Sequence, residues 1–542
     1  MSLRSDDTDE TSEGEGIKKY FNVHKPVFWP SVILIVAMIT TTLVMGEQAR
    51  SMFETVQSYI SNNMGWLFIL SVNTFLIFSL AIAFSRFGSI RLGGADAKPE
   101  FSTMAWFAML FSAGMGIGIM FWSVAEPIYH FLSPPMAEGK TVEAARQAMS
   151  LTYLHWGFHA WGIYALVALS LAFFAFNRGL PLSFRSVFYP VLGDKIEGWI
   201  GDVIDTLAVL ATLFGLATSL GLGVKQVSAG LNHLFDVPDT VWLQVGLIVG
   251  ITMVATLSVV LGIDKGVRVL SEANIRIAVL FLVFMMIVGP TIYIMDSFVQ
   301  NLGHYANNIL TYSFWTESYE GSTWQNNWTV FYWAWWISWS PYVGMFIARI
   351  SKGRTVKEFV LGVLIAPSIV TFLWLAAFGG TAIDLEMQGI GNIGTAVEEN
   401  VATALFVLLE QFPLGFITSI IAIILVMSFF VTSSDSGSLV IDSLTSGGKL
   451  DAPVGQRIFW AQTEGAVAAV LLIGGGLNAL QTASITAGLP FLFILLLMCY
   501  SLYKGLSEEH QRKVKHKEKK ERNSYRKIVS KLISKQKEET TE

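Results

Sequence analysis

The sequence has few charged residues and almost no cysteine. Only 14% of its 542 residues are Asp, Glu, Lys or Arg, whereas soluble domains carry about 25%. In keeping with this shortage, 53% of the residues are hydrophobic and the mean hydropathy is +0.53. The single cysteine, Cys499, excludes a disulfide framework and a cysteine-based metal site. These absences exclude an ordinary cytosolic enzyme, a nucleic-acid-binding protein and a disordered scaffold, and they indicate an integral membrane protein.

Long apolar runs are abundant, and their lengths predict the fold class. A helix needs about 20 apolar residues to cross a hydrocarbon core of about 30 Å. We therefore expect an all-α integral membrane protein with 12 transmembrane helices. The expected spans lie near residues 27–47, 64–84, 102–125, 151–176, 203–223, 241–262, 274–296, 328–348, 358–381, 403–431, 458–476 and 480–503. The polar segment 298–322 is expected to lie along the outer interface.

The positions of Lys and Arg predict how the chain is oriented in the membrane. With the N-terminus inside, 32 of the 36 Lys and Arg residues fall on the cytoplasmic side. The four on the other side are Arg50, Lys140, Arg146 and Lys225. Cytoplasmic loops carry an excess of such residues, so we expect both termini to be cytoplasmic and the protein to be a multi-pass protein of the cell (plasma) membrane.

The two ends of the chain differ in charge, which suggests three parts. We expect an acidic N-terminal tail over 1–25, a twelve-helix domain over 26–505 and a basic C-terminal tail over 506–542. Both tails can be solvated segments that fix topology. A basic helix also gains about 1 kcal/mol per charge next to anionic lipids, so the C-terminal tail is a candidate lipid- or salt-sensing segment.

Three glycines interrupt the third expected span, at Gly114, Gly116 and Gly118. Glycine is a poor helix former, and small residues in membrane helices often serve close helix packing. Glycines at every second position wrap around a helix instead of lining one face. We therefore favour an unwound stretch whose freed carbonyls coordinate a cation or a substrate.

Aromatic residues gather in the middle of two expected spans. Trp336 and Trp339 are three positions apart and share a helix face, and the fourth span adds Trp156, Trp161 and Tyr164. Such residues often pack a core. With almost no charge at mid-membrane, however, they also suit a cage for a quaternary ammonium group, which has no N–H and is held by ring faces at about 2 kcal/mol or more per desolvated contact.

Hydroxyl and ionisable residues supply the remaining candidates. Residues 428–436 contain several hydroxyls at the expected end of the tenth span, and they either cap the helix or coordinate an alkali cation. Ionisable residues inside the spans are functional candidates, and they are Glu126, His155, His159, Asp205, Glu410 and Glu464. His155 and His159 are four apart, but no third metal ligand is evident, so we expect hydrogen-bonded histidines. No nucleophile elbow or phosphate-binding loop is found, so the chain is not expected to be an enzyme.

Four of these elements together resemble the betaine/choline/carnitine transporter family. They are Ala-Gly-Met-Gly-Ile-Gly at 113–118, the His-Trp and His-Ala-Trp pattern at 155–164, the Trp-rich element at 336–346 and Phe-Val-Thr-Ser at 430–433. The resemblance covers about residues 15–505. It implies a LeuT-like five-plus-five inverted repeat preceded by two extra helices, with repeat one at about 102–297 and repeat two at about 328–503. It also implies a homotrimer.

The resemblance assigns roles to individual residues. Trp156, Trp161, Tyr164 and Trp336 match the betaine cage, with Trp339 beside it, and the glycine-broken helix gives backbone groups to the substrate carboxylate. One sodium site matches the carbonyls of Ser112, Met115 and Phe429 and the side chains of Thr432 and Ser433. Thr212 and Tyr342 match only part of a second sodium site, because Leu216 stands where the family has Thr and Tyr342 where it has Phe.

These matches predict sodium-coupled import of glycine betaine or a related compatible solute for osmoprotection. Proton-coupled choline members tend to carry Asp where this chain has Gly118, and sodium-independent carnitine exchangers carry an Arg that its fifth span lacks. Expected partners are the quaternary-ammonium or zwitterionic solute, sodium as the co-transported ion and anionic lipid at the basic tail, with no nucleic acid and no cofactor. The alternatives are a transporter of ectoine, carnitine, choline, proline or dimethylsulfoniopropionate, coupling to protons, and a betaine sensor without transport.

Overall fold

The computed structural model describes residues 21–114, 116–260, 264–449 and 453–539. Within these ranges the regular structure is helical, and the only β-type pairing is an isolated antiparallel bridge between Arg91 and Thr355. The expectation of an all-α protein is confirmed for the part of the chain that the structure describes.

Among the described residues, nine helical segments are long and apolar enough to cross a membrane, and a tenth crossing results if the bent pair α4–α5 counts as one span. The nine segments are Lys25–Met45 (α2), Glu47–Phe84 (α3), Val142–Arg178 (α6 and α7), Trp199–Phe235 (α10), Val241–Val260 (α11), Val269–Val288 (in α12), Val356–Met387 (α16 to α17), Gly415–Thr445 (α20) and Val454–Ile533 (in α21). The chain is therefore a multi-pass membrane protein.

The bounds of the other α-helices within the described residues are as follows, and two 3-10 helices, Gly193–Glu197 and Val401–Thr403, accompany them. The longer helices are α4 (Thr103–Gly114), α5 (Ile117–Leu132), α6 (Val142–Trp156), α7 (Phe158–Arg178), α12 (Asp264–Val288), α13 (Thr291–Phe314), α15 (Thr329–Ile350), α16 (Val356–Leu375) and α21 (Val454–Glu539). The short helices are α8 (Phe184–Val187), α9 (Tyr189–Leu192), α14 (Trp324–Asn327), α17 (Thr381–Met387), α18 (Ile393–Glu399) and α19 (Ala404–Glu410). A π-helical turn, Ala376–Gly380, joins α16 to α17.

Three expected spans are helical although they do not stand as separate apolar segments. The eighth, near 328–348, coincides with α15, whose many Trp, Tyr and Ser side chains make it less apolar than the nine. The eleventh and twelfth both lie in α21. Gly476 interrupts that helix between them, with φ 60° and ψ −133°.

The boundaries predicted for the tenth span are wrong. The segment near 403–431 contains a short helix, α19, and only the first part of α20, which begins at Gly415 and continues to Thr445. The interruption falls after Glu410, where Leu414 adopts a left-handed backbone conformation with φ 65°. Residues 428–436 therefore lie in the middle of α20 and are not a helix end.

The fourth and seventh expected spans also differ from the helices observed. The helical stretch of the fourth begins at Val142 and breaks at Gly157, where a Cβ atom would approach Phe372 Cζ to 2.5 Å. The seventh ends at Val288 instead of residue 296, because Pro290 has no N–H to continue the helix. The segment 298–322, expected not to span, begins within α13, which is not among the nine.

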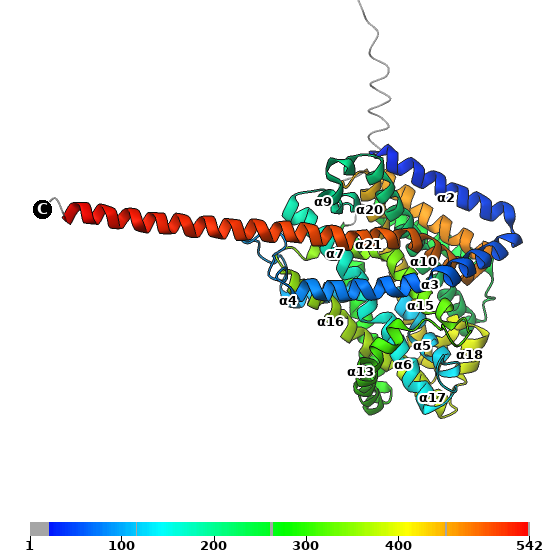
Figure 1. The fold of residues 1–542 in the computed structure, drawn as a ribbon. Coiled ribbons are helices and arrows are strands. Elements are labelled where there is room, and N and C mark those ends of the chain that lie inside the picture. The colour runs from blue at the N-terminus through cyan, green and yellow to red at the C-terminus, as the bar shows by residue number, and fades with distance from the viewer. Residues whose placement is uncertain (1–20, 115, 261–263, 450–452, 540–542) are drawn as a thin grey trace, which may run out of the picture.

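The most buried helices form the centre of the bundle. In the most apolar stretch of each segment, the share of residues that are buried is 89% for α6–α7 and 83% for α10. It is only 28% for α2 and 22% for α12. α10 packs against α15, α20 and α21, and α7 packs against α15. Figure 1 shows α2 along the edge of the bundle and α21 leaving it as a single rod. Of the predicted site residues that the structure describes, Ser112 and Gly114 lie on α4, Gly116 and Gly118 at the start of α5, and the others on α6, α7, α10, α15 and α20.

Candidate functional site

The glycine-rich element separates two helices at the position where the glycines predict an interruption. α4 ends at Gly114 and α5 begins at Ile117, and the two axes differ by 68°. Gly116 is extended, with φ −169° and ψ −166°, and a Cβ atom there would meet nothing within 4 Å. Met115 lies outside the described residues. A broken helix of this kind exposes backbone groups that can bind a ligand.

Gly118 allows two indole rings to approach the backbone of α5. A Cβ atom at this position would lie 2.7 Å from Cη2 of Trp335 and 3.2 Å from Cη2 of Trp156. The first distance is far below a normal carbon–carbon contact. Glycine at 118 is therefore required for the observed position of Trp335, and it sets how closely Trp156 approaches α5.

Three of the predicted cage rings meet edge to face. The ring centroids of Trp156 in α6 and Trp336 in α15 are 5.0 Å apart at 76°, and those of Tyr164 in α7 and Trp336 are 6.2 Å apart at 80°. Trp336 Nε1 donates to the His155 carbonyl at 2.8 Å. All three rings are buried. The structure thus brings together residues 180 positions apart in the sequence, as a cage requires, while their binding role stays a prediction.

Tyr164 adds a polar group to these rings. Trp161 packs edge to face on it at 5.5 Å, from the same helix. The Tyr164 hydroxyl is buried and has no hydrogen-bond partner among the described residues. Because a buried hydroxyl without a partner costs free energy, this oxygen is available to a polar group of a bound solute.

Trp339 lies one turn further along α15 and is anchored differently. Its Nε1 donates to the Gly215 carbonyl of α10 at 2.9 Å, and its ring packs edge to face on Tyr342 at 5.4 Å. A Cβ atom at Gly215 would lie 2.8 Å from Trp339 Cδ1, so glycine permits this approach. Trp339 is half-buried, which fits a place beside the cage.

The residues predicted for the first sodium site are only partly joined. Thr432 Oγ1 donates within α20 to the carbonyls of Phe429, at 3.2 Å, and Ser428, at 3.1 Å. Ser433 is buried next to it. Ser112 lies on α4, and among the described residues no hydrogen bond joins it to Thr432 or Ser433.

Asn274 of α12 is a neighbour of this site that the sequence analysis missed. Its Nδ2 lies 3.4 Å from Thr432 Oγ1, and its Oδ1 accepts a hydrogen bond from Ser428 Oγ at 2.5 Å. Asn274 is an amide-bearing residue inside an apolar helix, which is the signal that could have drawn attention to it.

The residues predicted for the second sodium site lie on different helices. Thr212 is buried in α10 and donates to the Ala208 carbonyl at 2.7 Å, and Tyr342 is on α15. Leu216 is fully buried, and a Cβ atom at Gly437 of α20 would come within 2.2 Å of its Cδ1. An apolar side chain in tight contact with α20 therefore fills the position where the family has a threonine.

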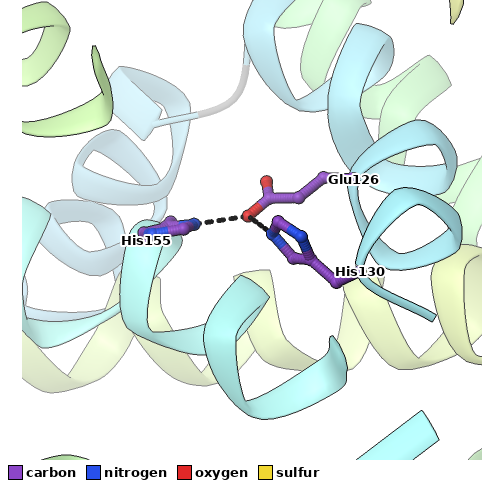
Figure 2. A group of neighbouring side chains, drawn as sticks. All are labelled: Glu126, His130 and His155. Carbon is purple, nitrogen blue, oxygen red and sulfur yellow. Dashed lines mark hydrogen bonds and ion pairs between the residues drawn. The ribbon is translucent and has the colours of Figure 1, made fainter. Parts of the chain in front are cut away.

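A buried polar cluster lies directly beside the cage. Glu126 Oε1 is 2.6 Å from His155 Nδ1 and 3.3 Å from His130 Nε2, as Figure 2 shows. Glu126 Oε2 accepts hydrogen bonds from Trp156 Nε1, at 2.7 Å, and from the Tyr332 hydroxyl. The sequence makes Glu126 and His155 separate candidates and did not lead us to His130. The signal was present, because His130 follows Glu126 by four positions on one helix.

The interpretation of the two histidines in the fourth span is thereby corrected in part. His159 Nε2 lies 3.2 Å from Asn73 Oδ1, so both histidines are hydrogen-bonded as expected. A group of three possible metal ligands is nevertheless present, and it contains His155 but not His159. One ligand atom each of Glu126, His130 and His155 lies within 4.8 Å of the other two. His155 faces Glu126, not His159.

The other ionisable candidates have local partners. Asp205 pairs with Arg185 at 2.5 Å, and Glu464 accepts from Ser434 at 3.0 Å. Glu410 is exposed at the end of α19, 3.3 Å from His233. None of these contacts involves a cage ring.

A cavity of about 480 Å³ lies next to the polar cluster. Its wall includes Trp122, Tyr129 and Trp328 together with many amide side chains, and none of the five cage residues lines it. Trp328 also packs on His130, with centroids 4.5 Å apart. The cavity wall is therefore in contact with the cluster around Glu126 through Trp328 and His130.

Comparisons with known proteins show which family the chain resembles over its length. The model of the betaine/carnitine/choline transporter family matches residues 26–511. Glycine betaine transporter 1 of Vibrio parahaemolyticus is 50% identical over 93% of this chain and 98% of its own length. A glycine betaine/proline/choline/ectoine transporter of the same organism is 49% identical, over 93% of this chain and 91% of its own. A glycine betaine transporter of Bacillus subtilis is 46% identical, over 91% and 96%.

The family model matches nearly the whole chain, and the sequence identity to these relatives is 46–50%, so the chain is homologous to them. These relatives are named as transporters, and the prediction that the chain is not an enzyme is confirmed. The resemblance stated from the sequence is likewise confirmed. The chain belongs to the betaine/carnitine/choline transporter family.

Proposed function

We propose that this chain is a sodium-coupled symporter that imports glycine betaine or a related compatible solute for osmoprotection. The observation that carries the proposal is the meeting of Trp156, Tyr164 and Trp336 from three helices, beside the broken pair α4–α5. The names of the relatives, which include glycine betaine in each case reported above, support the same kind of substrate.

The geometry suggests how each half of a betaine would be held. Ring faces attract the trimethylammonium group. This group has no N–H, so it cannot donate a hydrogen bond to an acceptor. The backbone N–H groups in the first turn of α5, which have no partner within the helix, and the unpaired hydroxyl of Tyr164 can bind the carboxylate. Sodium at the hydroxyls of Thr432 and Ser433 would stabilise the loaded state.

The proposal extends to the whole molecule. It places twelve spans in a LeuT-like five-plus-five inverted repeat, with both termini cytoplasmic, in the plasma membrane and in a homotrimer. The two repeats would rock against each other around the central site to alternate access. The kink at Gly476 supports the division of α21 into an eleventh and a twelfth span.

The test is uptake of labelled glycine betaine into proteoliposomes that contain the purified full chain. An inward sodium gradient should drive accumulation above equilibrium, and potassium in its place should not. Accumulation under a pH gradient alone would assign the coupling to protons. Movement of ectoine, proline, choline or carnitine, but not of betaine, would change the cargo, and betaine binding without any accumulation would favour a sensor.

A matched pair of variants tests the sodium site in the same assay. Thr432→Val removes the hydroxyl while keeping the shape, and we expect it to raise the sodium concentration needed for half-maximal uptake. Thr418→Val removes a hydroxyl whose hydrogen bonds among the described residues go to the carbonyls of Leu414 and Gly415 at the start of α20, and it should leave the sodium dependence unchanged. Equal behaviour of the two variants would contradict the assignment of Thr432.

A further inference from the structure

Glu126 is the common hydrogen-bond acceptor for side chains of three helices. Trp156 Nε1 of α6 donates to its Oε2 at 2.7 Å, and the Tyr332 hydroxyl of α15 donates to the same oxygen. His155 of α6 and His130 of α5 donate to Oε1, at 2.6 and 3.3 Å. The carboxylate thus ties together α5, α6 and α15, and two of these helices, α6 and α15, carry cage rings.

The cluster is sealed from solvent, which makes its hydrogen bonds obligatory. Glu126, His130 and His155 are all 0% exposed. A buried carboxylate is costly unless donors surround it, and here four donors do. Removing one partner from such a network leaves a buried charge or donor without its match.

The partners of His155 are compatible with a neutral ring. Its Nε2 lies 2.9 Å from Thr329 Oγ1, a hydroxyl that can donate, while Nδ1 faces the carboxylate. Neutral His155 with the proton on Nδ1 satisfies both contacts. His130 donates through Nε2, and its Nδ1 has no partner among the described residues. Two neutral histidines and one ionised carboxylate therefore account for the whole set.

Trp156 is the member of this network that reaches the cage. Its N–H points to Glu126, and its ring packs on Trp336 at 5.0 Å. An indole has only two side-chain torsions, so a hydrogen bond at Nε1 fixes the direction of the ring face. Gly118 leaves room for the ring at 3.2 Å but does not hold it there.

From these contacts we infer that Glu126 is a positioning residue of the solute site, which holds the Trp156 ring at the angle needed to face a quaternary ammonium group. This inference rests on the proposed function. Glu126 acts through Trp156 and does not touch the solute. The class of ligand follows from the ring it orients, since a cation attracted to an indole face is sensitive to the tilt of that face.

The first experiment measures the Trp156 N–H itself and needs no substrate. Full-length protein labelled with ¹⁵N in the tryptophan side chains gives one indole signal per tryptophan, and Trp156→Phe identifies the signal of Trp156. We expect Glu126→Gln to shift that signal. Glu464→Gln, a change at another buried acid whose hydrogen bond is to Ser434, should not. An unmoved Trp156 signal in Glu126→Gln would overturn the inference.

The second experiment measures glycine betaine binding and uptake. Glu126→Gln keeps the size of the side chain but removes its charge, and we expect about a tenfold weaker affinity, with KM raised more than the maximal rate is lowered. Trp156→Phe loses the same hydrogen bond, so the double variant should be no weaker than the weaker single variant. If the loss of affinity in the double variant equals the product of the two single losses, the two residues act independently, and this result would contradict the inference.

Two controls separate the remaining explanations. Trp374→Phe removes the N–H of a buried tryptophan that has no partner among the described residues, and it should keep wild-type affinity. Inhibition of the wild type by micromolar zinc, lost in Glu126→Gln, would overturn the inference by showing that the three side chains hold a metal. If the wild type binds no betaine, the proposed function fails, while the indole signal still decides whether Glu126 positions Trp156.

Discussion

Trp336 joins the two sides of the candidate cage, since its ring contacts Trp156 on one side and Tyr164 on the other. We expect Trp336→Leu to weaken glycine betaine binding about 30-fold, because a desolvated cation–aromatic contact contributes about 2 kcal/mol. Binding to purified protein in detergent is the measurement. Trp374→Leu, at a buried tryptophan of α16 outside the cage, is the control for loss of bulk. Wild-type affinity in a folded Trp336→Leu protein would refute the cage.

Gly118 offers a second prediction at the same scale. Gly118→Ala would force Trp335 and Trp156 to move, because a Cβ atom would lie 2.7 and 3.2 Å from them. Overpacking of this kind costs about 1–3 kcal/mol, so we expect the KM for betaine uptake to rise about tenfold. Gly246→Ala, where a Cβ atom meets nothing within 4 Å, should leave uptake unchanged. If both variants transport normally, Gly118 does not set the ring positions.

How much of the site was predictable depends on whether its parts share a helix. Trp336 and Trp339 are three apart, so their common face follows from helix geometry alone. The hydrogen bonds from Trp156 and Tyr332 to Glu126 connect α5, α6 and α15, and no spacing in the sequence encodes them. The same holds for Asn274, which reaches Thr432 from α12.

At the scale of an element, Gly476 carries a backbone conformation that other residues avoid. Its φ of 60° and ψ of −133° interrupt α21, and a Cβ atom there would meet nothing within 4 Å. Gly476→Ala should therefore destabilise the protein by about 1–3 kcal/mol through backbone strain alone. The thermal unfolding midpoint in detergent measures this. Gly303→Ala in α13, with equal space and an ordinary φ, should not lower the midpoint.

The element boundaries show where apolar run length stops being informative. The count of residues in a run places a span but does not detect a break inside it, so α19 and α20 were merged into one segment. At Gly157, the ring of Phe372 from α16 lies where a Cβ atom would be, and no spacing in the sequence encodes this contact. The break at 114–116 was predictable because three glycines mark it within the local sequence.

At the scale of the molecule, the basic tail is the feature most easily separated from the rest. The described side chains over 518–533 are exposed and bury nothing against the bundle. Deleting 516–542 should therefore leave the unfolding midpoint and basal uptake unchanged. If the tail binds anionic lipid, the deletion should remove the response of uptake to the anionic lipid content of the vesicles and to raised osmolality. An unchanged response would exclude a regulatory tail.

The junction between bundle and tail is firmly held. Arg178 at the end of α7 donates to the Gly505 carbonyl at 3.0 Å and lies 3.3 Å from Glu508 and 3.7 Å from Glu509. These contacts fix the direction in which α21 leaves the bundle. Deleting 516–542 keeps all of these contacts, so it tests the exposed basic segment and not the contacts that hold α21 to α7.

The continuity of α21 makes the tail a lever arm. The helix runs without a described break from the last membrane crossing through residue 539, and residues 506–533 alone extend about 40 Å at about 1.5 Å per residue. A tilt of about 5° at its base would therefore move residue 533 by about 4 Å. Small movements of the final membrane helix are amplified at its basic end, and forces on that end act back on the helix that packs against α10 and α15.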